Sequence, residues 1–178
     1  MKSREVTIME VLNFREEKAR MQKKMHTDCP EGTVVSLGMN IPGPVKSGPS
    51  VFRAFCEGKR ELRRVILEGA GIIVQEQMLE ETAGYAAIYL VQGIERQKIK
   101  KIAVLLEETH PLGRLFDVDV LKENLESVSR TEIRATRRRC LLCNGDAKVC
   151  GRSRAHAVRE LQEKVDTIIC NWEEGLYL

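Results

Sequence analysis

The sequence contains few aromatic residues and no long apolar segment. Aromatic residues make up 4% of the chain, with one tryptophan, whereas single-stranded nucleic acid is bound through aromatic side chains that stack on its bases. The longest apolar run, residues 86–91, falls well short of the roughly 18–20 residues that span a bilayer. No apolar signal-peptide segment follows the first five residues. We therefore expect a cytoplasmic protein that contacts no membrane and for which nucleic acid is a disfavoured partner.

Internal repeats and low-complexity segments are also absent from the sequence. The chain has 178 residues, and chains of about 100–200 residues bury a single core. Hydrophobic residues make up 43% and charged residues 31%, which is typical of a soluble globular protein. We therefore expect one domain over residues 1–178, which includes a basic segment rich in cysteine and histidine at residues 137–156.

Positive charge is concentrated in the last third of the chain, although the formal net charge is only +3. Residues 130–159 contain two acidic residues, Glu132 and Asp146, against nine basic ones: Arg130, Arg134, Arg137, Arg138, Arg139, Lys148, Arg152, Arg154 and Arg159. This local excess predicts an anionic partner. Charge alone does not distinguish nucleic acid, a polyphosphate ligand and an acidic protein.

Several segments have the apolar spacing or the cap residues of helices. Thr7 and Glu10 match a capping box, in which each side chain accepts a bond from the other residue's backbone N–H group. Ser50 is the expected N-cap of a second helix. Apolar residues at three- and four-residue steps predict two more helices. The expected helices cover residues 7–25, the segment after Ser50, residues 92–108 and residues 152–172.

Short runs rich in β-branched and aromatic residues predict strands. These strands cover residues 33–37, 72–77, 85–91 and 113–121, with 125–130 as the hairpin partner of the last strand; a strand at 102–106 is an alternative to part of the third helix. The elements are interleaved without the regular alternation of a doubly wound sheet. We therefore expect an α+β domain in which a mixed or antiparallel sheet packs against helices, including an N-terminal and a C-terminal helix.

The last of these strands alternates strictly at its centre. Phe116, Val118 and Val120 point to one side, and Asp117 and Asp119 point to the other. Two carboxylates on one face of a strand stay ionised together only if a cation or several hydrogen-bond donors compensate them. In phosphoryl and nucleotidyl transfer, carboxylates of this kind hold magnesium together with substrate phosphates.

Asp117 and Asp119 are therefore candidate magnesium ligands. A solvent-exposed hairpin face that happens to carry two aspartates is the alternative interpretation. Arg114 precedes the pair, and His110 and Gly113 belong to a conformationally restricted segment that leads into the strand. These neighbours favour a functional role.

A stiff loop precedes the second helix. Residues 41–49 contain three prolines and two glycines, together with Lys46. A loop at a helix N-terminus offers unpaired backbone N–H groups to a phosphate, and the lysine adds a positive charge. A plain connection with a surface lysine is the alternative.

Three of the six cysteines lie close together in the basic segment. Cys140, Cys143, Cys150 and His156 could close a tetrahedral zinc site, with His156 in the first turns of the last helix. The alternative is a set of small buried thiols and a histidine that caps a helix or binds phosphate. The remaining cysteines are interpreted as ordinary core or surface residues.

The string at residues 110–120, His-Pro-Leu-Gly-Arg-Leu-Phe-Asp-Val-Asp-Val, resembles the signature of the citrate lyase holo-acyl-carrier-protein synthases. Their formal name is apo-citrate lyase phosphoribosyl-dephospho-CoA transferase. The similarity covers nearly the whole chain in the family's order. It includes residues 43–46, 75–77, 129–130, 138–143 and 149–150, together with Arg15, Gln22, Phe55, Gly58, Ala147 and His156.

The resemblance implies a transferase that attaches the prosthetic group of citrate lyase. The donor would be triphosphoribosyl-dephospho-CoA, the acceptor a serine of the acyl-carrier subunit, and the second product diphosphate. Asp117 and Asp119 would hold magnesium against the triphosphate, and one of them or a nearby base would take the serine proton. The other implied site residues are His110 and Arg114 for catalysis, and Gly43, Lys46, Arg130, Arg138 and Arg139 for binding the donor or the carrier.

Two other functions fit parts of the pattern. A zinc-stapled nucleic-acid-binding module would explain the cysteines among arginines, and it would bind nucleic acid with an affinity that falls steeply as salt rises. A noncatalytic chaperone of the carrier would bind that subunit and leave its mass unchanged. The transferase hypothesis instead predicts a gain in the mass of the carrier.

Overall fold

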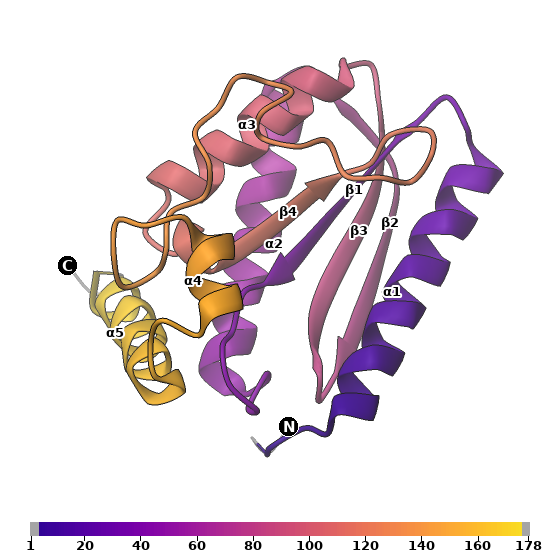
Figure 1. Cartoon of the computed structure of the whole chain (residues 1–178). Helices are drawn as coiled ribbons and strands as arrows, with labels where there is room; N and C mark the ends of the chain where they lie inside the picture. Colours follow the sequence, from indigo (N-terminus) through magenta and orange to yellow (C-terminus); the bar gives the residue numbers. More distant parts are fainter. Residues whose placement is uncertain (1–3, 176–178) are drawn as a thin grey trace.

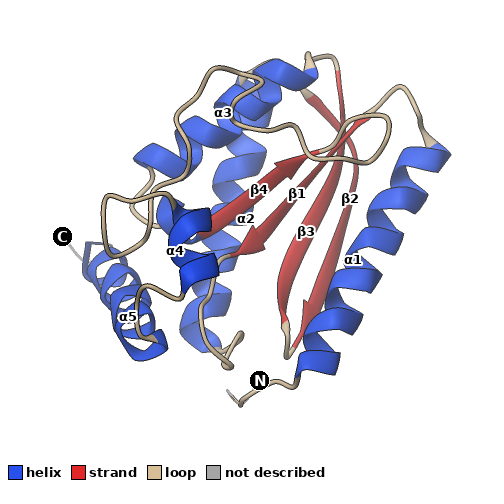
Figure 2. Cartoon of the chain, viewed as in Figure 1, coloured by secondary structure: helices blue, strands red, loops and turns tan. Residues whose placement is uncertain are grey.

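The computed structural model describes residues 4–175. In this part of the chain, a four-stranded sheet lies between helices (Figures 1 and 2). The strand order is β2-β3-β1-β4, and all three pairings are antiparallel. The strands are β1 (Thr33–Met39), β2 (Ile72–Glu81), β3 (Gly84–Gln92) and β4 (Phe116–Val120). The predicted α+β class is confirmed, with the sheet of the antiparallel type.

The helices cover both faces of this sheet. α1 contacts β1 and β3 from one side, whereas α2 and α3 pack on the other side (Figure 1). α5 packs beside α2, and a short 3-10 turn, η1, leads into β4. The helices are α1 (Ile8–Asp28), α2 (Pro49–Glu68), α3 (Arg96–Thr109), α4 (Ala147–Ser153) and α5 (Val158–Gly175), and η1 is Gly113–Leu115. Residues 102–106 are therefore helical.

The strand alternation divides the buried side chains between the two faces. The larger core lies toward α2 and α3, and it includes Leu37, Tyr89 and Val118. A smaller cluster lies under α1 and includes Met25 and Ile88. Because the buried Phe116, Val118 and Val120 face the larger core, the aspartates between them face the α1 side.

The first helix begins as predicted and the second does not. Thr7 Oγ1 accepts a hydrogen bond from the Glu10 N–H at 3.2 Å, and Glu10 Oε2 accepts one from the Thr7 N–H at 2.8 Å. The prediction that Ser50 caps α2 is wrong, because the cap is Gly48 and has no side-chain bond. Pro49 occupies the first helical position, where its fixed φ is preorganised and its missing N–H is not needed.

Two further expectations are corrected. Residues 125–130 form no hairpin strand: one bridge joins Leu121 to Ser127, and Leu125 has a φ of 63°, which interrupts an extended conformation. The last helix begins at Val158 rather than at 152, because α4 ends in a left-handed Arg154 with φ 49°. His156 therefore lies in the connection between α4 and α5.

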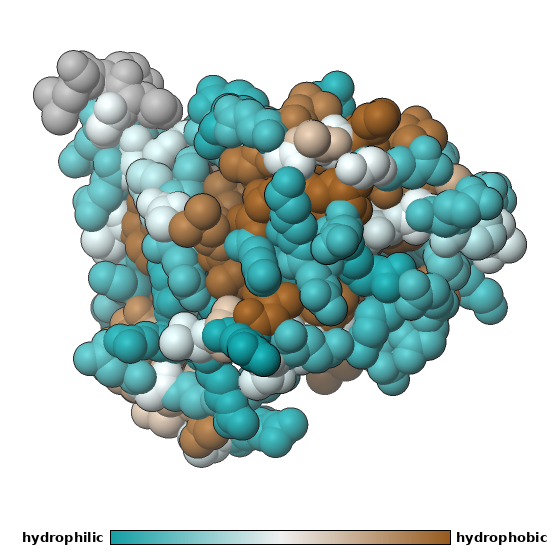
Figure 3. Space-filling view, turned by 90° about the horizontal axis from the view of Figure 1, so that it is seen from above, coloured by the Kyte–Doolittle hydropathy of each residue, from teal (hydrophilic) through white to brown (hydrophobic). Residues whose placement is uncertain are grey.

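The described surface mixes hydrophilic and hydrophobic side chains, as the face in Figure 3 shows. Among residues 4–175, no helix combines the length and the apolar character that crossing a membrane requires.

Candidate active site

The two aspartates of β4 lie side by side on the α1 side of the sheet. Asp117 is paired across the sheet with Gly38, and Asp119 with Ser36, both of β1. Their neighbours in β4 are buried, whereas just over half of the Asp117 side chain and about a third of the Asp119 side chain are exposed. The predicted alternation of this strand is confirmed.

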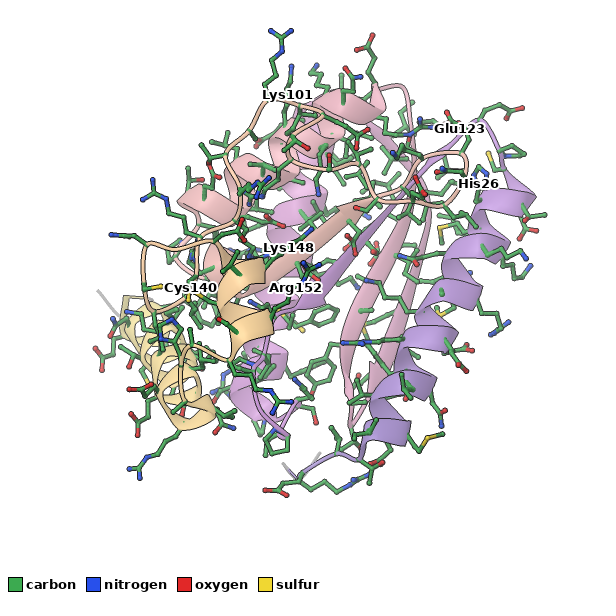
Figure 4. All side chains as sticks on the ribbon, viewed as in Figure 1. His26, Lys101, Glu123, Cys140, Lys148 and Arg152 are labelled. Carbon is green, nitrogen blue, oxygen red and sulfur yellow. The ribbon has the colours of Figure 1, made fainter. Side chains whose placement is uncertain are left out.

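Both aspartates line a pocket of about 550 Å³ at the β4 edge of the sheet. Glu107 and Asp146 add two more carboxylates to the lining. Lys148 and Arg152 project from α4 toward the strands (Figure 4). The basic residues of the pocket are Lys100, Arg130, Arg137, Arg138, Lys148 and Arg152. This combination suits a polyphosphate that is bound together with a divalent cation.

Asp119 is held by groups from two other segments. Lys18 Nζ of α1 lies 3.3 Å from Asp119 Oδ2, and the Ser127 hydroxyl donates to Asp119 Oδ1 at 3.0 Å. One turn along α1, Gln22 Nε2 donates to Ser36 Oγ at 2.9 Å. The α1 helix therefore contributes polar side chains to this side of the sheet. Lys18 was not predicted, because on a helix this polar it is indistinguishable in sequence from a solvated lysine.

Asp117 faces Arg138. The Arg138 Nη1 atom lies 3.4 Å from Asp117 Oδ1, and Nη2 donates to the carbonyl oxygens of Arg114 and Phe116 at 2.7 Å each. Although the side chain is partly accessible, burial of the carboxyl in the pocket raises the pKa of Asp117, and the charge of Asp119 raises it further. Arg138 opposes this effect. The second carboxylate and the limited hydration both favour a cation beside Asp117.

Charged side chains also complete the hydrogen bonding of β4. Lys100 Nζ donates to the Val118 carbonyl at 2.8 Å, and Glu107 Oε1 accepts from the Val118 N–H at 2.9 Å. Both side chains belong to α3 and both residues are buried. Burial lowers the pKa of Lys100, against the opposing charge of Glu107. Arg130 pairs with Glu107 and, at 2.6 Å, with Glu108.

The four predicted metal-ligating residues of the basic segment come together. The candidate ligand atoms of Cys140, Cys143, Cys150 and His156 all lie within 4.8 Å of one another. Cys143 Sγ and Cys150 Sγ are 3.6 Å apart, and tetrahedral zinc with Zn–S bonds of about 2.3 Å would place two sulfurs about 3.8 Å apart. The buried His156 Nε2 atom has no hydrogen-bond partner among residues 4–175. This cluster can hold a metal ion.

The thiol of Cys140 lies among backbone donors. Burial raises its pKa, but hydrogen bonds from the N–H groups of Cys143 and Leu142, and then from the thiols of Cys143 and Cys150, together outweigh burial and bring the pKa to about 7. A thiolate is the form that binds metal.

Comparison with known proteins identifies the family. The family model described as apo-citrate lyase phosphoribosyl-dephospho-CoA transferase matches residues 6–172. The chain belongs to this family.

Curated relatives agree with this assignment. A "Probable apo-citrate lyase phosphoribosyl-dephospho-CoA transferase" of Streptococcus pyogenes serotype M18 is 34% identical over 167 residues, which cover 92% of this chain and 85% of that protein. A protein with the same description from Vibrio cholerae serotype O1 (strain M66-2) is 35% identical over 133 residues, or 75% of each chain. "Protein CitXG" of Leuconostoc mesenteroides subsp. cremoris is 30% identical over 96% of this chain and 36% of its own length. The resemblance seen in the sequence is confirmed.

Two residues of the string at residues 110–120 lie outside this pocket. Arg114 Nη2 donates to the carbonyl oxygens of Arg139 and Cys140 at 2.6 and 2.9 Å, so it holds the segment that carries the first cysteine. His110 Nδ1 accepts from the Leu112 N–H at 3.1 Å, and its ring packs on Phe116. Phe116 belongs to the core on the opposite side of β4 from the aspartates.

The loop before α2 also lies apart from the pocket. Lys46 Nζ donates to the Ile41 carbonyl oxygen, and burial followed by the charge of Arg15 lowers the pKa of Lys46. Gly43 has a φ of 83° and lies against α5, where a Cβ would meet Gln162 Nε2 at 2.5 Å. Of the residues predicted to bind donor or carrier, Arg130 and Arg138 line the pocket, whereas Gly43, Lys46 and Arg139 do not.

Proposed function

We propose that the pocket beside Asp117 and Asp119 is where this single-domain transferase joins the phosphoribosyl-dephospho-CoA group to a serine of the citrate lyase acyl-carrier subunit. The donor is triphosphoribosyl-dephospho-CoA. The serine oxygen attacks the phosphorus nearest the ribose, the bond from that phosphorus to the diphosphate breaks, and the serine proton passes to a base. The products are a phosphodiester-linked carrier and diphosphate.

One observation supports this proposal above the others: four carboxylates, including the adjacent Asp117 and Asp119, and six basic side chains line one pocket. A magnesium ion held by Asp117 and Asp119 would neutralise charge that develops on the departing diphosphate. Lys148 and Arg152 form no ion pair with any residue that the structure describes, and both line the pocket. We assign them the binding of the donor phosphates, in place of Lys46, which the resemblance implies for donor or carrier binding but which lies outside the pocket.

The remaining pocket arginines have mixed roles. Arg138 Nη1 points to Asp117 while Nη2 binds the Phe116 carbonyl oxygen of β4, so Arg138 connects the strand to the reacting phosphates. Arg130 is paired with two glutamates, and in this arrangement it supports Glu107 rather than contacting the donor directly. Lys18 keeps Asp119 beside α1 and limits the net negative charge of the two aspartates.

We also propose that Cys140, Cys143, Cys150 and His156 hold a structural zinc ion. Thiolate and imidazole ligands suit zinc, and four protein ligands leave no open position for substrate or water. Closed sites of this kind stabilise a fold rather than perform chemistry. The unpartnered His156 Nε2 atom supports this assignment, because a buried ring nitrogen without a partner is costly.

Intact-mass spectrometry of the carrier tests the transferase proposal. The purified protein is incubated with apo-carrier, triphosphoribosyl-dephospho-CoA and magnesium, and the carrier should gain the mass of the phosphoribosyl-dephospho-CoA group. Asp117→Asn and Asp119→Asn should each slow transfer by about 10²–10³-fold, the loss seen when one group that stabilises developing charge is removed. Asp166→Asn on α5, exposed and outside this pocket, is the matched control and should keep the parent rate.

The outcomes separate the candidate functions. Transfer within tenfold of the parent in both pocket variants would remove the aspartates from the active site. A carrier that binds without gaining mass would instead support the noncatalytic chaperone. Salt-sensitive binding of duplex DNA by a protein that modifies no carrier would support the nucleic-acid-binding module.

A further inference from the structure

The cysteine–histidine cluster and the phosphate pocket are built from the same short stretch of chain. Residues 137–156 contain all four candidate metal ligands and also four of the six basic residues of the pocket. α4 connects the two sites directly: Cys150 belongs to the cluster, whereas Lys148 and Arg152 line the pocket (Figure 4). Any change in the position of this helix therefore affects both sites.

The segment that precedes α4 also contributes residues to both the pocket and the cluster. Arg138 faces Asp117 in the pocket, and Cys140 follows two residues later in the cluster. Backbone bonds connect this segment to the start of α4: the Cys140 N–H donates to the Gly145 carbonyl at 2.7 Å, and the Ala147 N–H donates to the Arg138 carbonyl at 2.9 Å. Residues 138–147 thus form a closed loop between the two sites.

Hydrogen bonds made by Arg114 and Arg138 also hold residues 138–140, but little apolar packing fixes α4 itself. α4 has seven residues and none of them is buried, and an isolated helix this short is not stable in water. Cys140 is the one buried residue in the whole stretch 137–156. A wall with so few apolar contacts needs another constraint to hold two cationic side chains at a phosphate site.

We propose that zinc bound by Cys140, Cys143, Cys150 and His156 fixes α4 and Arg138 as the basic wall of the pocket, so that occupancy of the metal site sets the affinity for the donor triphosphate. This inference rests on the proposed polyphosphate-binding function of the pocket. The four metal ligands are positioning residues, since none of them lines the pocket that contains the aspartates. The buried, unpartnered His156 Nε2 and the 3.6 Å separation of two sulfurs are the observations that point to the ion.

The test compares Cys143→Ser with Cys170→Ser, an exposed cysteine on α5 outside the cluster. Zinc content is measured by elemental analysis, and affinity for inorganic triphosphate by calorimetry in excess magnesium. We expect about one zinc per chain in the parent and in Cys170→Ser, and none in Cys143→Ser. Cys143→Ser should bind triphosphate about tenfold or more weakly, which corresponds to loss of one charged hydrogen bond.

Two more measurements separate positioning from general damage to the fold. Hydrogen exchange should accelerate in residues 137–156 of Cys143→Ser, whereas β1 and β3 keep the protection of the parent. Treating the parent with a zinc-selective chelator should reproduce the weaker binding, and added zinc should restore it. In the transfer assay, KM for the donor should rise by more than kcat falls.

Three results would overturn the inference. These are a parent that neither contains nor takes up zinc, a triphosphate affinity that is unchanged after zinc is lost, and unchanged exchange in α4 after zinc is lost. The triphosphate measurement does not depend on turnover. A parent that transfers nothing but binds triphosphate in a zinc-dependent way would therefore refute the proposed reaction and support this inference. A parent that modifies the carrier but binds triphosphate equally well with and without zinc would support the reaction and refute this inference.

Discussion

Two adjacent glutamates on α3 pair with the same arginine but differ in burial. Glu107 is 6% exposed; it binds Arg130 and accepts a bond from the Val118 N–H at 2.9 Å. Glu108 also binds Arg130, at 2.6 Å, but 45% of its side chain is exposed. Glu107→Ala would leave a buried N–H group without an acceptor and would remove the better shielded partner of Arg130. Glu108→Ala removes a pair that water screens.

Because of these contacts, the two substitutions should lower the free energy of unfolding by different amounts. Removing one partner of a buried ion pair costs about 3–5 kcal/mol, so we expect Glu107→Ala to lower the free energy of unfolding by this amount. An exposed pair contributes about 0–1 kcal/mol, and Glu108→Ala should lose no more than that. Urea unfolding with linear extrapolation measures both. Equal losses in the two variants would refute the view that Glu107 secures the edge of β4.

Four other substitutions test local features of the fold. Thr7→Ala removes the cap of α1 and should cost about 0.5–2 kcal/mol in urea unfolding. Gly113→Ala should cost about 1–3 kcal/mol or more, because a Cβ would lie 2.5 Å from the Leu106 carbonyl oxygen, whereas Gly151→Ala meets nothing within 4 Å and should leave stability unchanged or slightly higher. Hydrogen bonds from Arg4 and then from Thr7 lower the pKa of Glu10 to about 2. The difference in unfolding free energy between the parent and Glu10→Gln should therefore reach its full size above pH 4.5 and should shrink as the pH falls toward 2.

Elements whose determinants lie close together in sequence could be predicted. The capping box needs only Thr7 and Glu10, three residues apart, and α1 begins there. The alternation of β4 needs only five residues, and it places Asp117 and Asp119 on one face whatever strand lies beside them. Local chemistry fixes both features, so the sequence suffices.

Elements that depend on distant contacts could not be predicted. Residues 125–130 are predicted as the hairpin partner of β4, but Leu125 adopts a left-handed conformation and Arg130 turns to Glu107 of α3. The break between α4 and α5 begins at Arg154, and the connecting residues 154–157 contain no proline or glycine that would predict it. Cys150 before this break and His156 after it come together with two earlier cysteines, a contact that no local pattern predicts.

The same distinction applies to the site. The signature groups Arg114 and His110 with the aspartates, yet their side chains lie elsewhere, since closeness in sequence before a strand does not place side chains on the same face. Lys18 and Lys100 approach Asp119 and Val118 from helices that a sequence pattern cannot place against β4. Only the packing of α1 and α3 on opposite sides of the sheet brings them to its edge.

The edge of β4 connects stability to function. An edge strand exposes unpaired N–H and carbonyl groups that can pair with other chains. Here the Phe116 carbonyl is bound by Arg138, and the two polar groups of Val118 by Lys100 and Glu107. All three charged side chains also line the pocket. A substitution of any of them changes both the closure of the sheet and the charge of the pocket, so its effect on transfer is interpretable only after correction for the folded fraction.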